Sequence, residues 1–283
     1  MEESISIPRE SGATADPSAA WSWAQAFQVH WPEYFMEATE LALFMISACV
    51  FTTLLEFPGS PVRGLLPNPV LRRLLNGIAM GLTLLLLVHS RWGKQSGAHM
   101  NPTVTLMFFR LGKVGGWDAL FYSVFQFLGG ISGVLFAYGI LGSALAHPPV
   151  NFIVTEPGRW GTGMAFGAEI AITFLMALTV LVTSNHKALS RFTPYFAATL
   201  LAFYIFLEAP YSGMSLNPAR TFGSSIVAQN FRSIWIYFAA PALGMLLAGE
   251  LFLLFGTKRG VFCAKFHHDN KMRCIFRCRY HEL

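Results

Sequence analysis

Two short segments of the chain hold the residues whose types and spacing could do chemistry. One contains Asn101-Pro102-Thr103 and the other Asn217-Pro218-Ala219, each within apolar surroundings. An asparagine amide offers two N–H donors and one carbonyl acceptor to a neutral polar partner. Asparagine also suits the N-cap of a helix, and proline suits the first helical turn, where its missing N–H costs nothing. Each Asn-Pro box therefore predicts a helix N-terminus with a hydrogen-bonding side chain at its tip.

These boxes favour the binding of a solute over bond-breaking chemistry. The sequence contains no His-Glu-x-x-His pattern, no Gly-x-Ser-x-Gly pattern and no paired aspartates on facing apolar segments. Ser96, Ser212 and Ser224 lie near the boxes but have no evident base. Because nucleophilic and metal-assisted catalysis need such arrangements, we expect a protein that is not an enzyme and that has no cofactor and no metal site.

The composition indicates that lipid is the main solvent of this chain. Of its 283 residues, 54% are hydrophobic and 12% are charged, and the mean hydropathy is +0.48. Soluble domains contain about 25% charged residues. The net charge of +5 arises largely from basic residues after the last apolar run, where they suit anionic lipid headgroups rather than nucleic acid. We therefore expect an integral protein of the cell or inner membrane, with the lipid bilayer and not nucleic acid as its surroundings.

Six apolar runs are long enough to cross a membrane, which takes about 20 helical residues. They cover about residues 34–56, 73–91, 117–141, 163–184, 192–209 and 232–256. The segments that contain the boxes, 97–110 and 213–228, are apolar but too short to span a core of about 30 Å. We interpret each as a loop that enters the membrane and continues as a half-helix.

The runs and half-helices form an internal repeat, over about residues 33–141 and 163–256. Each half reads as a helix with a glutamate, a second helix, an Asn-Pro half-helix and a third helix, and the glutamates are Glu37 and Glu169. Three spans per half is an odd number, so the second half must be inverted relative to the first. Short, interrupted segments at matching places in inverted repeats indicate a site near the membrane midplane.

Inversion brings the two half-helix N-termini together near the centre of the membrane. Each carries about half a positive unit charge, so cations are repelled there. The side chains of Asn101 and Asn217 offer donors at the same place. Unwound backbone at 95–100 and 211–216 offers carbonyl acceptors, which is tolerated at membrane depth when it lines a water-filled path. This arrangement predicts a passive route that passes water and repels cations.

The distribution of lysine and arginine predicts which side faces the cytoplasm. With both termini inside, fourteen basic residues lie on the inner side and five on the outer side, with Arg220 set aside as a pore candidate. The outer residues are Arg63, Arg72, Arg73, Arg159 and Arg232. We therefore expect a multi-pass protein with both termini in the cytoplasm.

The segments Ser96–Thr105 and Gly213–Gly223 closely resemble the two signature loops of aquaporins, the major intrinsic protein family. The resemblance covers about residues 33–256 and is closest to water-channel-like members of bacterial type. It implies an all-α membrane fold with six transmembrane helices and two re-entrant half-helices in an inverted repeat, and a homotetramer with one pore per subunit. It implies that Glu37 and Glu169 support the re-entrant loops. It also implies pore-lining loop residues, which are Gly97, Ala98, His99, Gly213 and Ser215. His99 alternatively serves as a packing histidine.

The resemblance places a selectivity filter at the outer constriction. Its members would be Arg220, Met214, Ile205, and either Met80 or Gly81 from the second helix. Strict water channels of the family usually place histidine and phenylalanine there, and glycerol-passing members place aromatics beside the arginine. This chain departs from both patterns, since it offers isoleucine and methionine. It also carries Thr103 where most members carry alanine, a change that we expect to leave the pore intact.

Other positions favour water. Thr221, Ser225 and the pair Tyr237-Phe238 stand where glycerol-type members usually carry aspartate, a basic residue and a proline-aliphatic pair. We expect a channel for water that also lets through small neutral solutes such as hydrogen peroxide, ammonia or glycerol. A glycerol and small-solute facilitator of the same fold is the first alternative. An ion-coupled secondary transporter is the second, although asparagines fill both central positions where coupling would need an ionisable group.

The two ends of the chain read as separate segments. Residues 1–32 form a polar N-terminal segment, and residues 257–283 form a basic cytoplasmic tail. The tail holds several residues that can bind metals, namely Cys263, His267, His268, Cys274, Cys278 and His281. Their spacing matches no standard zinc pattern, so a solvated tail is the main interpretation, with palmitoylation and zinc binding as alternatives. The cytoplasmic placement argues against disulfides, and Cys49 within an apolar run reads as inert packing.

Overall fold

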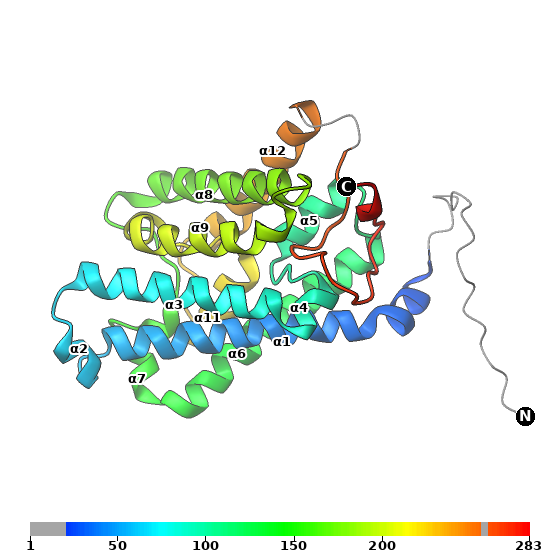
Figure 1. Cartoon of the computed structure of the whole chain (residues 1–283). Coiled ribbons are helices and arrows are strands. Elements are labelled where there is room, and N and C mark those ends of the chain that lie inside the picture. Colours follow the sequence, from blue (N-terminus) through cyan, green and yellow to red (C-terminus); the bar gives the residue numbers. More distant parts are fainter. Residues whose placement is uncertain (1–20, 256–259) are drawn as a thin grey trace, which may run out of the picture.

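The computed structural model describes residues 21–255 and 260–283, and its six long helices run alongside one another (Figure 1). All six are long and apolar enough to cross a membrane, the fifth when it is counted from Ser190 to Leu207. They are α1 (Trp23–Glu56), α3 (Pro69–His89), α6 (Gly116–Leu141), α8 (Gly161–Ser184), α9 (Thr193–Leu207) and α12 (Ile234–Phe255). Shorter elements connect them: α2 (Pro61–Leu65), α4 (Arg91–Ser96), α7 (Ser143–Ala146), η1 (Asn151–Ile153), η2 (Ser190–Phe192), α10 (Ala209–Ser212) and η3 (Tyr280–Glu282). The prediction of an all-α fold with six spans is confirmed.

Two helices are half the length of a span and begin at the Asn-Pro boxes. They are α5 (Pro102–Arg110) and α11 (Pro218–Ala228). In each, the asparagine side chain caps the first turn, because Asn101 Oδ1 accepts the N–H of Thr103 and Asn217 Oδ1 accepts those of Ala219 and Arg220. At 1.5 Å per residue, such helices reach about 15 Å, or half of a membrane core.

The inverted repeat is visible in how the long helices pair. Helix α1 packs along α6 in the first half, α8 packs along α12 in the second, and α3 and α9 pack against each other between the halves. Glycines permit the close approach in each pair: a Cβ on Gly129 would lie 2.2 Å from Ala38 O, and one on Gly244 would lie 2.6 Å from Ile170 O. Small residues at helix contacts are the usual solution in membranes, where packing rather than water exclusion drives association.

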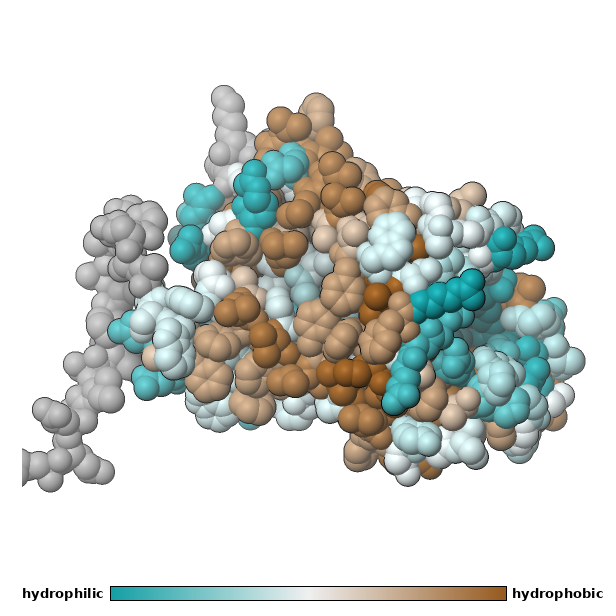
Figure 2. All heavy atoms as spheres, turned by 180° about the vertical axis from the view of Figure 1, so that it is seen from behind, coloured by the Kyte–Doolittle hydropathy of each residue, from teal (hydrophilic) through white to brown (hydrophobic). Residues whose placement is uncertain are grey.

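Large apolar side chains cover the outside of the bundle. Leu86 and Leu254 are 72% and 76% exposed, which would be unfavourable for a water-facing helix. Figure 2 shows hydrophobic side chains across the middle of one face and hydrophilic ones gathered toward its two ends. This distribution suits a molecule whose middle is surrounded by lipid.

The first helix begins earlier than the apolar run predicts. Its N-cap is Ser22, which forms a capping box with Gln25, so residues 23–32 of the expected polar segment are helical. Helix α1 is held there by polar contacts with α6: Asp118 Oδ1 lies 2.7 Å from His30 Nδ1 and accepts the hydroxyl of Tyr34 at 2.6 Å. The sequence criterion missed this start because polar residues such as Gln25, Gln28 and His30 interrupt the apolar ones in the extension. The expectations for residues 1–20 lie outside the described residues.

The expectation of a solvated C-terminal tail is wrong for residues 261–266. Cys263, Ala264 and Lys265 are buried, and the tail crosses the end of the bundle beside α4 and α5 (Figure 1). The segment folds back with little regular structure, ending in the single turn η3. Burial of its apolar side chains, which include Val261, Phe262 and Phe276, explains why it does not remain in solvent. Residues 256–259 lie outside the described residues.

Candidate functional site

The two loops that precede the half-helices have the same backbone conformation. Three residues in each have positive φ, at positions separated by a constant 116 residues. The angles are 98° at Gly97, 57° at Ala98 and 47° at Met100, and 81° at Gly213, 54° at Met214 and 60° at Leu216. A positive φ at a residue with a side chain costs free energy and must be held by its surroundings. The matching angles show that the two halves build the same loop.

Glu37 on α1 holds the first loop. Its carboxylate is fully buried and accepts the backbone N–H of His99 at 2.9 Å and that of Met100 at 2.5 Å. The side chain of Gln126 on α6 donates to the same carboxylate at 2.8 Å. A buried carboxylate is tolerated when several donors satisfy it.

Glu169 on α8 holds the second loop in the same way. It accepts the backbone N–H of Ser215 at 2.7 Å and of Leu216 at 2.9 Å. The hydroxyl of Ser212 donates to it at 2.7 Å and also accepts the N–H of Met214 at 3.0 Å. Two buried glutamates from corresponding helices thus fix two strained loops at corresponding residues.

Further supports of the loops were missed by the sequence analysis. Ser96 and Ser212 begin the two loops, and each accepts a backbone N–H two residues later. The hydroxyl of Tyr122 donates to Ser96 O at 2.8 Å, and that of Tyr237 donates to Ser212 O at 2.5 Å. The shared Ser-Gly pair before each box was the available signal, but a search for catalytic bases could not reveal a structural role.

The two half-helices meet through their asparagines. Asn101 Nδ2 donates to Leu216 O at 2.8 Å, and Asn217 Nδ2 donates to Met100 O at 2.7 Å. Each amide therefore spends one N–H on the opposite loop and keeps the other for a solute. Thr103 adds a hydroxyl that donates to Asn101 Oδ1 at 2.8 Å, so it supports the cap without entering the contact between loops.

A cavity runs past the two asparagines. Its lining comes from the two loops and half-helices, namely Ala98, His99, Met100, Asn101, Val104, Ser215, Leu216, Asn217 and Arg220, and from apolar side chains of the long helices, which include Leu41, Phe44, Leu84, Met176, Ala197, Leu201 and Met245. The cavity is therefore largely apolar, with the asparagine and arginine side chains as hydrogen-bonding groups.

Arg220 lines this cavity one turn into α11. Its Nη1 donates to Ile153 O at 2.9 Å, in the connection between α6 and α8. Thr221 beside it lies 2.8 Å from Thr155 Oγ1, which ties the same connection to the half-helix. The guanidinium is thus held by a backbone carbonyl, and the Arg220 side chain also lines the cavity.

The other filter candidates lie in different settings. Met80 and Met214 are buried, and Ile205 packs partly buried against the core. Gly81 lies in the contact between α3 and α9, where a Cβ would come 2.7 Å from Ala198 O. Of the two filter candidates on the second helix, we therefore retain Met80. Among the described residues, Arg220 is the one filter candidate that lines the cavity.

His99 combines the two interpretations that the sequence left open. It lines the cavity, and its ring is also packed between Phe108 and Phe276, with ring centroids 5.2 Å and 5.3 Å away. Its Nδ1 lies 3.0 Å from Thr105 Oγ1, and its Nε2 lies 2.8 Å from Ala264 O in the tail.

Two lysines lie where the tail meets the bundle. Lys265 Nζ donates to three backbone carbonyls, those of Lys94, Met272 and Arg273. Lys113 Nζ donates to Arg277 O at 3.2 Å. Burial lowers the pKa of both lysines, because it disfavours the charged form.

The sequence and the fold were compared with those of known proteins. The family pattern described as Major intrinsic protein matches residues 32–252. Aquaporin A of Dictyostelium discoideum is 33% identical over 185 residues, 64% of this chain and 65% of that protein. Glycerol uptake facilitator protein-like 6 of Lactiplantibacillus plantarum is 32% identical over 185 residues, 64% of this chain and 85% of that protein. The chain thus matches about two thirds of the length of Aquaporin A.

The fold has a counterpart among solved structures. The aquaglyceroporin from Plasmodium falciparum superposes with a TM-score of 0.64 at 18% sequence identity, covering 79% of this chain and 95% of that chain. The likeness at this identity shows a shared fold. Because the family pattern covers most of the chain, the assignment does not rest on the loops alone. The chain therefore belongs to the major intrinsic protein family, whose members are passive membrane channels and not enzymes.

Proposed function

We propose that this protein is a passive channel for water, which also passes small neutral solutes such as hydrogen peroxide, ammonia and glycerol, and which excludes protons and ions. One observation carries the proposal: the two asparagine amides each donate to the opposite loop, at the meeting point of two half-helix N-termini beside a cavity. Each amide has one N–H left to donate to the oxygen of a passing molecule.

The exclusion of charge follows from the same arrangement. Two helix N-termini directed at one place give a positive potential, and Arg220 adds a full positive charge to the path. Pores of this kind exclude protons and cations through their width, the hydrogen-bonding groups that line them and electrostatic barriers such as an arginine or the positive ends of half-helices.

The choice among neutral solutes depends on the outer constriction. Met80, Ile205 and Met214 are proposed to form it together with Arg220. Apolar side chains remove the hydrogen bonds that would favour water over a molecule of similar width. The relatives include proteins named as an aquaporin and as a glycerol uptake facilitator, so similarity does not choose between water and glycerol.

The test is a parallel measurement of permeability in proteoliposomes. Water, glycerol and ammonia fluxes would be followed by stopped-flow light scattering and pH-sensitive fluorescence, with empty liposomes and a strict water channel as controls. We expect water flux well above empty liposomes, and glycerol or ammonia flux above that of the strict water channel. Water flux at the level of empty liposomes would refute the channel, and glycerol and ammonia selectivity equal to the strict water channel would refute the solute leak.

A glycerol and small-solute facilitator of the same fold is the first alternative, since one of the relatives is named as a glycerol uptake facilitator. It predicts glycerol flux comparable with that of a known facilitator and little water flux. The ion-coupled transporter has less support, since the described residues that line the cavity include no carboxylate. Imposing a proton gradient separates it, because a passive channel gives the same solute flux with and without the gradient.

We also propose a homotetramer with one pore per subunit and both termini in the cytoplasm. The family suggests the tetramer, and the exposed apolar faces of the long helices could form its contacts. Native mass spectrometry from detergent gives the subunit number directly.

A further inference from the structure

The C-terminal tail brings four metal-binding side chains to one place. The sulfur atoms of Cys263, Cys274 and Cys278 and a ring nitrogen of His268 all lie within 4.8 Å of one another. Cys263 Sγ is 3.6 Å from Cys274 Sγ, and Cys278 Sγ is 2.9 Å from His268 Nε2. The four residues span 16 positions of a segment with little regular structure, so their convergence comes from the fold of the tail.

The distances suit one tetrahedral ion. Zinc binds sulfur at about 2.3 Å and nitrogen at about 2.0 Å, so neighbouring ligand atoms in a tetrahedron lie about 3.5 to 3.8 Å apart. The four atoms therefore need to shift by about 1 Å or less to surround the ion. Three cysteines and one histidine are a usual ligand set for a structural zinc site, and such a site is closed to solvent molecules.

The surroundings of the cluster also suit a structural ion. Tyr280 stacks on the His268 ring with centroids 4.2 Å apart, and its backbone N–H donates to Cys278 Sγ at 3.4 Å. These contacts orient two ligands from outside the cluster, as in well-built zinc sites. A site with three thiolates and one zinc carries one net negative charge, which the basic residues of the tail offset.

The same segment covers one end of the pore. The N–H of Phe266 donates to Gly97 O at 3.2 Å, and Ala264 O lies 2.8 Å from His99 Nε2. Gly97 and His99 are predicted pore-lining groups, and here both contact the tail. The Phe266 side chain itself lines the cavity.

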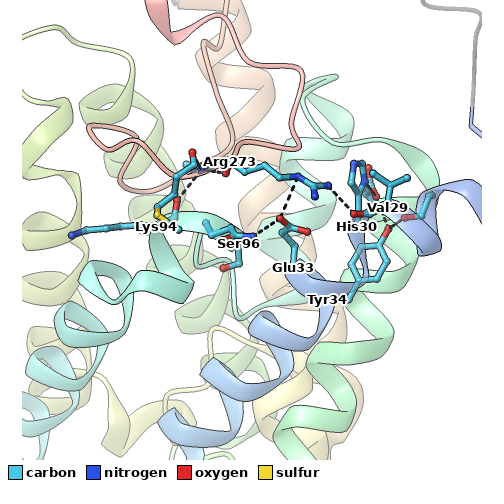
Figure 3. A network of polar contacts seen from close by, with 12 residues as sticks. Val29, His30, Glu33, Tyr34, Lys94, Ser96 and Arg273 are labelled. Atoms are coloured by element: carbon cyan, nitrogen blue, oxygen red, sulfur yellow. Dashed lines mark hydrogen bonds and ion pairs between the residues drawn. The ribbon is translucent and has the colours of Figure 1, made fainter. Parts of the chain in front are cut away.

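Contacts on two sides fix the segment to the bundle. Figure 3 shows the Arg273 side chain reaching from the tail to α1, where its Nη2 donates to Val29 O at 2.8 Å and its Nε lies 3.6 Å from Glu33 Oε1. On the opposite side, the N–H of Phe262 donates to Asn185 Oδ1 at 2.7 Å, after α8. The tail therefore lies across the bundle end.

We propose that Cys263, His268, Cys274 and Cys278 bind one zinc ion, and that the ion folds residues 260–283 into a cap that closes the pore end beside the first loop. Binding replaces the protons of the three thiols with the ion and changes no oxidation state. A segment this short has too small a core to hold a fixed shape alone, and a metal ion supplies the missing stability. The closing role, unlike the metal site, rests on the proposed channel function.

The metal site is tested on the full chain, purified through a tag without histidines and without chelators. Elemental mass spectrometry should give about one zinc per chain, and the replacement variants Cys274→Ser and Cys278→Ser should give almost none. Cys49→Ser is the matched control, because Cys49 is a buried cysteine of α1 away from the cluster, and it should keep its zinc. Zinc below about one tenth per chain, or a disulfide among the tail cysteines in thiol titration, would overturn the site.

The closing role is tested by water flux in proteoliposomes. Cys274→Ser and Phe266→Ala should each raise water permeability several-fold over the zinc-loaded protein, and Cys49→Ser should not. If the unchanged protein binds zinc and all four proteins show the same water permeability above empty liposomes, the cap does not close the pore. No flux in any of them would instead refute the channel, while the zinc content decides the metal site independently.

Discussion

Arg220 is the charged side chain that a solute meets in the cavity. Its guanidinium donates a hydrogen bond to Ile153 O at 2.9 Å. This backbone carbonyl, and not the solute, therefore holds the guanidinium in place. A fixed positive charge repels cations and narrows the path. Both effects would disappear with an apolar side chain.

We therefore expect Arg220→Val to raise the permeability to small solutes or to protons. Lowering a barrier by about 1.4 kcal/mol increases a rate about tenfold, so a partial loss of repulsion gives a measurable change. Glycerol uptake and proton leak would be measured in proteoliposomes at matched protein density. Arg232→Val is the control, because Arg232 lies in an exposed connection outside the cavity. Selectivity equal to that of the control would contradict the role of Arg220.

At the residue scale, substitutions of Glu37 and Glu169 test whether their carboxylates support the loops. In Glu37→Gln or Glu169→Gln, an amide N–H2 replaces one oxygen and faces a backbone N–H donor. Leaving such a buried donor without a partner costs about 1 to 3 kcal/mol. We expect each variant to unfold several degrees lower in detergent, by a thermal fluorescence assay.

The control for the glutamates is Glu250→Gln. Glu250 pairs with Arg110 at 2.8 Å on the surface, with 45% of its side chain exposed, and such pairs contribute little. Its midpoint should stay close to that of the unchanged protein. If both buried glutamates behave like Glu250, the carboxylates do not hold the loops.

Residues with a fixed chemical task were the easiest to predict from the sequence. The asparagines, the prolines and the two glutamates could be found because their types are rare in apolar surroundings. Ser96, Ser212, Tyr122 and Tyr237 were missed, because they hold backbone atoms of the loops, and the Ser-Gly pair before each box does not by itself reveal that role. The sequence could not decide between Gly81 and Met80 as the filter residue, since a shift of one residue in the spacing changes which of the two faces α9.

At the scale of elements, glycines set the distance between α1 and α6. A Cβ at Gly129 would lie 2.2 Å from Ala38 O, so Gly129→Ala must push the helices apart. Overpacking of this kind costs about 1 to 3 kcal/mol. We expect a lower unfolding midpoint in detergent for this variant.

Gly139 provides the matched control on the same helix. A Cβ there meets nothing within 4 Å, and alanine favours the helix more than glycine does. Gly139→Ala should therefore leave the midpoint unchanged or raise it. Equal losses in the two variants would mean that the close contact at Gly129 does not explain the effect.

The long helices could be predicted because each must cover the membrane with apolar residues. Their ends were less accessible: α1 extends to Trp23 through polar contacts with Asp118 that no hydropathy pattern marks. The tail was predicted as solvated because its segments are short and basic. Its burial depends on carbonyls of the first loop and on Asn185, groups that lie far away in the chain.

At the scale of the molecule, the two halves of the inverted repeat are alike, but the two ends of the helix bundle differ. Both loops, both glutamates and both half-helices correspond in position and in hydrogen bonds. The tail breaks this symmetry, because it covers the end of the bundle next to the first loop and its Arg273 contacts the start of α1. The start of α1 and the C-terminal tail therefore lie at the same end of the bundle.

The last prediction concerns which side of the membrane that end faces. The sequence predicts fourteen lysines and arginines in segments on the side of the termini and five on the other, with Arg220 set aside, and cells retain such basic segments in the cytoplasm. An epitope tag at either terminus should bind antibody only after the cells are permeabilised, whereas the same tag in the connection 147–160 should be detected on intact cells. The control for cell integrity is the protein that carries the tag in the connection 147–160 and no tag at either terminus. Antibody binding to the terminal tags on intact cells would reverse the orientation, and the cap would then close the outer end of the pore.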